Sequence, residues 1–87
     1  MIDEKSKVRR YVAEFSEETE ELLATYELSS FNLIEFQREF RESNPRNPMF
    51  DSYSINESNL EFLSKYMFKE PVWDFLNKSY CVECCEI

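Results

Sequence analysis

Apolar and polar residues alternate in a stretch near the start of the chain, which predicts a β-strand over Val8–Phe15. Because successive side chains of a strand point to opposite faces, the apolar positions of this stretch share one face and the charged positions share the other. The first face carries Tyr11, Ala13 and Phe15, and the second carries Arg10 and Glu14.

A second alternating stretch, LLATYEL, places Leu22, Ala24, Tyr26 and Leu28 on one face of another strand. The polar sequence SEETE separates the two stretches, which is typical of a β-hairpin. A helix over Glu17–Leu28 is the alternative, since Glu, Leu and Ala favour helices and a serine precedes the segment. The alternation and the β-favouring residues Thr and Tyr within the stretch favour the strand.

The segment SSFNLIEFQREFRES contains the start signals of a helix. Asn32 is placed to cap it with Glu35 at the third helical position, and Phe31 is placed to pack onto Phe36. We expect the helix to end by Asn44, because a proline follows and disfavours helical backbone in the residue before it. Leu33, Phe36 and Phe40 form its apolar stripe.

The same start signal recurs after the connection NPRNPMFDSYS, with Asn56 as the cap, Ile55 before it and Leu60 after it. It predicts a second helix over about Glu57–Met67. The apolar stripe of this helix is Leu60, Leu63 and Met67, with Phe62 and Tyr66 on a flank.

The segment Val72–Leu76 is expected to be a short turn or extended piece before a final strand, SYCVECCEI. The predicted order is therefore β-β-α-α-β. An α+β fold, with a three-stranded antiparallel sheet and both helices packed on one face, buries the apolar stripes with short connections. We expect a single domain over residues 1–87, with residues 1–7 as a flexible N-terminus.

Composition restricts the chemistry that this domain can perform. The chain has no His, which removes the commonest general base and the imidazole ligand of most catalytic metal sites. It has no Gly, which excludes a Walker loop or a dinucleotide fingerprint. No pair of carboxylates and no Ser or Lys arrangement indicates catalysis, so we expect a binding protein rather than an enzyme, without a cofactor.

The three cysteines, Cys81, Cys84 and Cys85, have a spacing that also occurs in zinc and thiol-exchange sites. In a strand, however, Cys84 points one way with Tyr80 and Val82, and the other two cysteines point the opposite way with Glu83. A thioredoxin-like pair also opens a helix, and none is predicted here. We therefore expect a packed strand of reduced thiols and no metal site, with a thiol or metal-binding protein as the weaker alternative.

No stretch has the length and apolarity of a signal peptide or a membrane span, so we expect a cytoplasmic protein. The net charge is −8, with 18 Asp and Glu against 10 Lys and Arg. Such a charge repels nucleic acid and anionic membranes and attracts a basic partner. We expect no small-molecule substrate.

Acidic residues concentrate in the predicted hairpin loop, which holds four carboxylates within five positions. A second candidate contact is the PMFDSY loop, where aromatic residues flank an aspartate. A third acidic group lies toward the C-terminus. The residues predicted to bind a partner are Glu17, Glu18, Glu20, Glu21, Asp51, Tyr53, Asp74 and Glu83.

The order of the pieces VAEFSEETEELLATYEL, FNLIEFQREF, NPMFDSYSI, LEFLSKY and YCVEC resembles that of small acidic bacterial immunity proteins of contact-dependent growth inhibition and other polymorphic toxin systems. These pieces cover most of residues 8–84. The chain departs from the pattern in lacking Gly, in carrying NPRNP between the helices, and in ending with an extra CCEI.

This resemblance implies a protein that neutralises a cognate toxin, often a basic nuclease, by covering its active site or substrate groove. An acidic surface would compete with phosphate for the same cationic groove. The alternative is an acidic nucleic-acid mimic that inhibits a host DNA- or RNA-handling protein, as anti-restriction and phage anti-defence proteins do.

Overall fold

The computed structural model describes residues 2–3 and 8–86, with side chains over 8–86. Ile2–Asp3 form strand β1, and the rest of the segment expected to be flexible, residues 1 and 4–7, lies outside the described residues. The remaining elements follow in the order β2 (Val8–Ser16), β3 (Leu22–Glu27), α1 (Leu33–Glu39), β4 (Tyr53–Ser54), the 3₁₀ helix η1 (Glu57–Asn59), α2 (Leu60–Ser64) and β5 (Lys78–Glu86).

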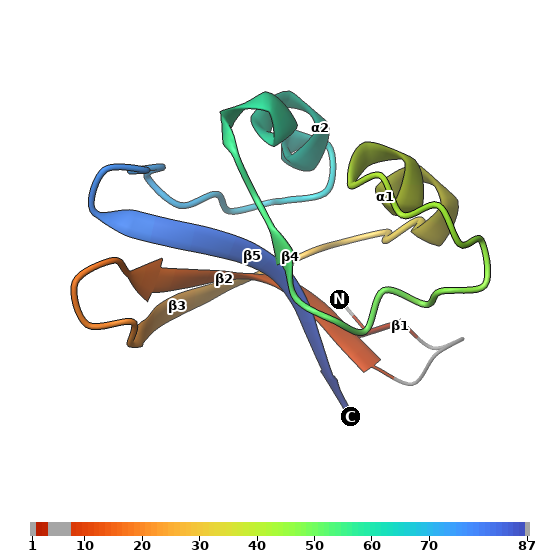
Figure 1. Cartoon of the computed structure of the whole chain (residues 1–87), viewed down its shortest axis with the longest axis horizontal. Helices are drawn as coiled ribbons and strands as arrows, with labels where there is room; N and C mark the ends of the chain where they lie inside the picture. The colour runs from red at the N-terminus through yellow and green to blue at the C-terminus, as the bar shows by residue number, and fades with distance from the viewer. Residues whose placement is uncertain (1, 4–7, 87) are drawn as a thin grey trace.

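The sheet is antiparallel and is built around β2 and β5, which pair over their whole length from Val8↔Glu86 to Ser16↔Lys78. On the other side of β2, β3 pairs with Tyr11–Phe15, and β1 pairs with Val8 and Arg9. The strand β4 pairs with β5 on its far side. Figure 1 shows α1 and α2 on the same side of this sheet, and none of the described residues forms a helix on the opposite side.

The α+β class, the antiparallel sheet and the two helices are thus confirmed. The prediction of only three strands was wrong, because the sheet also contains β1 and β4. Each of these is two residues long, too short for an alternating pattern to reveal. The alternative helix over residues 17–28 is also excluded, since β3 occupies half of that segment and a turn precedes it.

The two faces of β2 are reversed relative to what its pattern suggests. The face under the helices carries Arg10, Val12 and Glu14, and all three side chains are buried. The face with Tyr11 and Phe15 is the one that no helix covers, and both side chains are half-buried there. Alternation along the strand was predicted correctly, but the charged residues lie on the inner face.

Arg10 can lie in the core because its guanidinium donors have partners there. Nη1 donates to the carbonyl of Met49 at 2.7 Å and Nη2 donates to that of Pro48 at 2.8 Å. The guanidinium also lies 4.3 Å from the centre of the Phe31 ring. A buried cation is tolerated when hydrogen bonds and an aromatic face replace water in this way.

Gln37 binds the same connection from the helix side. Its buried side-chain amide donates to the carbonyls of Asn47 at 2.8 Å and Pro45 at 3.2 Å. Residues 44–49 have no helix or strand of their own, so their carbonyls depend on such donors where water is excluded. Arg10 and Gln37 therefore fasten the connection to the sheet and to α1.

The first helix begins as its sequence predicts. The Asn32 side chain accepts from the Glu35 N–H at 3.1 Å, and the rings of Phe31 and Phe36 lie 4.3 Å apart. Both the cap and the Phe31–Phe36 contact are confirmed. The helix ends at Glu39, before the predicted limit at Asn44.

The second helical segment is also capped as predicted, because Asn56 accepts from the Ser58 N–H at 2.9 Å. It is not one long helix, however. It starts as the 3₁₀ helix η1 and continues as α2 only to Ser64, so the prediction that it reaches Met67 was wrong. Two residues after the end of α2, the Tyr66 carbonyl accepts from the Ser29 N–H at 2.7 Å. This bond joins the chain after the helix to a segment distant in the sequence.

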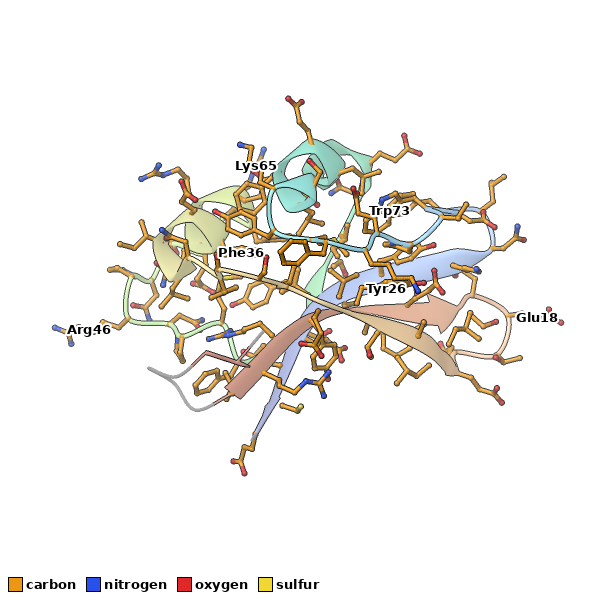
Figure 2. The ribbon with its side chains drawn as sticks, turned by 180° about the vertical axis from the view of Figure 1, so that it is seen from behind. Glu18, Tyr26, Phe36, Arg46, Lys65 and Trp73 are labelled. Atoms are coloured by element: carbon orange, nitrogen blue, oxygen red, sulfur yellow. The ribbon has the colours of Figure 1, made fainter. Side chains whose placement is uncertain are left out.

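The core lies between the sheet and the helices, and Figure 2 shows Phe36 within this layer. The Phe36 ring is fully buried and contacts the rings of Phe62 and Tyr66, each 4.9 Å away between centres. Ring-rich contacts of this kind bury a large area with few residues. The buried apolar side chains of this cluster are Val12, Leu28, Phe36, Met49, Ile55, Leu63, Tyr66, Met67, Tyr80 and Val82.

Four described residues other than glycine adopt positive φ: Glu20, Ser30, Arg41 and Met49, with φ between 56° and 62°. This region is unfavourable for side chains with a Cβ. Arg41 follows α1, where the Glu42 N–H bonds to the Gln37 carbonyl at 2.8 Å and the Arg41 N–H to the Arg38 carbonyl at 3.4 Å. This pair of bonds is the Schellman end of a helix, where glycine is preferred.

We therefore expect Arg41→Gly to stabilise the fold, because it removes the backbone strain at this exposed position. The free energy of unfolding in urea should rise by about 0.5–1 kcal/mol. Arg38→Gly is the matched control, since the same change inside the helix should lower stability by about 1 kcal/mol. Equal destabilisation by both variants would contradict the strain at Arg41.

Candidate functional site

The four acidic residues of the predicted hairpin loop lie on the tight connection between β2 and β3. The Ser16 N–H donates to the Glu21 carbonyl at 2.9 Å, and the Glu20 N–H donates to the Ser16 carbonyl at 2.8 Å. The Ser16 hydroxyl also accepts from the Thr19 N–H at 3.2 Å. These bonds close the turn without glycine, and Glu20 takes the positive φ that the turn requires.

All four carboxylates of this turn, those of Glu17, Glu18, Glu20 and Glu21, belong to exposed residues. None of them forms a hydrogen bond or ion pair with any residue that the structure describes. Figure 2 shows Glu18 at the tip of the hairpin and Arg46 at the opposite end of the molecule. The negative charge of the turn is therefore not neutralised by the arginines around α1.

A second turn lies beside the first, because the Glu17 N–H donates to the Asn77 carbonyl at 3.0 Å. Asp74 builds this turn. Its carboxylate accepts from the Leu76 N–H at 3.2 Å and from the Asn77 side-chain amide at 3.0 Å. The bonds from Asn77 and Leu76 lower the pKa of Asp74. Its charge thus serves mainly to hold the turn.

Exposed leucines accompany the carboxylates at this end. Leu76 is 91% exposed, and Leu22 and Leu23 are 57% and 48% exposed. Leu23 and Leu76 line an open hollow of about 440 Å³ together with Glu17 and Glu18. Lys78 also lines it, but its ammonium lies 3.8 Å from the buried Glu14 carboxylate. We call the surface formed by Glu17, Glu18, Glu20, Glu21, Leu22, Leu23 and Leu76 the acidic end.

The other predicted contact residues lie elsewhere. Glu83 pairs with Tyr11 across the sheet, five positions after the start of β5 at Lys78, and accepts from the Ser52 hydroxyl at 2.8 Å. Asp51 is exposed on the loop just before Ser52. The Tyr53 hydroxyl donates to the Glu42 carboxylate at 2.8 Å. The structure therefore separates Asp51, Tyr53 and Glu83 from the four glutamates and from Asp74.

The three cysteines alternate along β5 as predicted. The thiol of Cys84 donates to the Phe50 carbonyl at 3.5 Å, whereas Cys85 accepts from Arg9 at 3.9 Å on the other face. All three are half-buried, and none forms a disulfide with another described residue. Among the described residues, no group of three or more Cys, Asp or Glu side chains is placed to hold a metal ion.

Over residues 9–83 the sequence matches a protein family described as a domain of unknown function (DUF7683). The chain belongs to this family. No curated protein matches the chain, and no solved structure does either. Within the described residues, no helix is long and apolar enough to cross a membrane.

The DUF7683 match begins in β2 and ends in β5, so the family domain includes the central strand pair, both helices and the whole acidic end. The leucines of this end were not predicted from the sequence. The pattern places Leu22 on an apolar strand face, and Leu76 in a short turn or extended piece. The sequence DFLN is the signal that could have indicated Leu76, because its aspartate can accept from the N–H of the residue two positions later and hold that residue in a turn.

Tyr80 supports the acidic end from inside the core. Its hydroxyl accepts from the Asp74 N–H at 3.0 Å and donates to the Val72 carbonyl at 3.4 Å. Burial, together with the nearby Glu14 carboxylate, raises the pKa of Tyr80 to about 12. Burial and an acceptor carboxylate also raise the pKa of Tyr66 to about 12, with Glu35 as the acceptor.

The domain should therefore lose stability in alkali. A tyrosine in the unfolded chain ionises near pH 10, whereas Tyr66 and Tyr80 stay neutral in the folded chain until about pH 12. Between these values ionisation favours the unfolded state, so the free energy of unfolding should fall as pH rises. Urea denaturation from pH 8 to 11.5 measures this.

The Tyr66→Phe variant, which cannot ionise at that position, should show a shallower fall over the same range. It should lose some stability at neutral pH, because the hydrogen bond to Glu35 is removed. Parallel pH profiles for this variant and the parent chain would contradict the raised pKa of Tyr66.

Proposed function

We propose that the chain is an immunity protein that binds a cognate bacterial toxin domain, of the basic nuclease class, and neutralises it by occlusion. The observation that supports this proposal is the acidic end, where four exposed carboxylates that bond to no described residue lie close to exposed leucines. Exposed apolar side chains inside a charged rim are typical of protein interfaces. The order of sequence pieces that resembles known immunity proteins is the second support.

The carboxylates give the proposal its electrostatic part. Four like charges within one turn repel one another, a cost that a cationic partner would relieve on binding. The attraction acts over roughly the Debye length, about 8 Å at physiological salt, and it increases the association rate. The leucines then provide apolar contact, which slows dissociation.

The function is tested by co-expressing the chain with the basic toxin domains encoded next to its gene and measuring growth. Rescue of growth, together with a 1:1 complex in solution, is the expected result. Failure to rescue would overturn the proposal. Inhibition of a restriction enzyme or other DNA-handling host protein, without any toxin, would favour the nucleic-acid mimic instead.

The acidic end is tested by exchanging its four glutamates, Glu17, Glu18, Glu20 and Glu21, for glutamine. Affinity for the toxin should fall by about tenfold or more, mainly through a slower association that depends less on salt. Calorimetry and stopped-flow measurements at two salt concentrations give both quantities. Because these side chains are exposed and bond to no described residue, the fold should not change.

The matched control exchanges four other exposed glutamates, Glu57, Glu61, Glu70 and Glu86, for glutamine. The net charge then changes by the same amount at other places on the surface. We expect this control to lose less than about threefold in affinity. Equal losses in the two variants would mean that net charge, and not the acidic end, attracts the partner.

A further inference from the structure

The outer edge of β3 is open over the middle of the strand. The Leu28 N–H donates to the Arg10 carbonyl at 3.1 Å, so Leu28 faces β2. In an antiparallel ladder the backbone groups of alternate residues face the same partner, and those of the residues between them face away. The N–H and carbonyl of Thr25 therefore point away from β2, toward a side where the described chain has no further strand.

An apolar groove of about 460 Å³ runs along this edge. One wall is the end of β3 with Tyr26, continued by Leu28, and the other wall is the segment after α2 with Phe68 and Lys69. The Phe68 side chain is 96% exposed, although it stands beside this groove. Figure 2 shows β3 along the near side of the sheet, below the segment that leaves α2.

Natural proteins usually protect such an edge against pairing with other chains. Here the protection lies at the two ends of the strand. The register shifts between Glu14 and Phe15 and bulges β3 near Leu23 at its start, and the charged Glu27 is its last residue. Thr25 is exposed, is neither charged nor proline, and favours extended backbone. The middle of β3 is therefore competent to accept one more strand.

We propose that an extended, basic segment of a partner protein adds to the sheet beside β3 and places an apolar side chain in the groove against Phe68. The backbone edge selects an extended segment, because only a strand can bond to Thr25 in a ladder. The apolar groove selects an apolar side chain. Charge selects a basic segment, since β3 starts directly after Glu20 and Glu21 in a chain of net charge −8.

A second copy of the chain fits this edge less well. An antiparallel copy would bring its own Glu20 and Glu21 alongside Glu27, and like charges at neighbouring positions of paired strands are destabilising. Both copies would also carry the full charge of −8. Lys69 on the far wall of the groove is a cation, so the basic residues of the partner segment should lie at the Glu20–Glu21 end.

This inference concerns how a partner is held, and it rests on the proposed function only for the positive charge of the partner. Its test needs no toxin. The probe is a capped synthetic peptide, Lys-Lys-Thr-Val-Thr-Val-Thr-Lys-Lys, added to the isotopically labelled full chain. A second peptide carries Glu in place of every Lys, and a third carries Pro in place of the central Thr.

The lysine peptide should shift the NMR signals of residues 24–29 and slow hydrogen exchange of the Thr25 amide about tenfold or more. The glutamate peptide should bind more weakly because of its charge, and the proline peptide because it cannot complete the ladder. Shifts confined to residues 17–21 would mean that charge alone attracts the peptide, and would overturn the inference.

Thr25→Pro is the decisive variant, because it removes the outward N–H and leaves the side facing β2 intact. It should weaken peptide binding by about tenfold or more, whereas Thr25→Val, which keeps the N–H, should bind as the parent does. Equal binding by the two variants overturns the inference. Self-association of the parent chain that Thr25→Pro abolishes would also overturn it, because a second copy would then be the occupant.

Phe68→Ser tests the groove without changing the strand, and the fold should be kept because the Phe68 side chain is exposed. It should weaken binding at least threefold, whereas Val72→Ser, at another highly exposed apolar residue, should not. Equal loss of binding in these two variants would show that the groove does not contact the peptide. In the growth assay, rescue that survives Thr25→Pro but fails in the four-glutamine variant would reject this inference and leave the proposed function standing.

Discussion

The fold depends on two buried donors that hold a segment with no regular structure of its own. Arg10 from the sheet and Gln37 from α1 donate to carbonyls of residues 45–49, so the end of the connection lies against the core. This position brings Met49 into the apolar cluster. Without Arg10, the carbonyl of Met49 would lose its partner in a buried place, at a cost of about 1–3 kcal/mol.

The same arrangement explains where prediction from the sequence succeeded and where it failed. Strand alternation, the Asn32 and Asn56 caps and the Phe31–Phe36 contact are local signals, and all are present in the structure. The inner face of β2 could not be predicted, because Arg10 is buried by carbonyls 38 and 39 positions away in the sequence. The early end of α2 likewise follows from a contact with distant Ser29.

The candidate site shows the same division. The four glutamates of the turn between β2 and β3 could be identified because they are neighbours in the sequence, and all four are exposed in the structure. Leu76 joins them only through the contact between the Glu17 and Asn77 backbones, which no local pattern reveals. Asp74 and Tyr53 were chosen for their chemistry, but each forms hydrogen bonds within the fold. Composition cannot distinguish such structural polar groups from available ones.

The pairing of β2 with β5 has a consequence for how the domain comes to be folded. These strands form the centre of the sheet, yet about sixty residues separate the end of one from the start of the other. During translation the first strand therefore emerges from the ribosome long before its main partner has been made. Until then its apolar side chains lie in a loosely collapsed chain. The sheet can form cooperatively only once β5 has also left the ribosome.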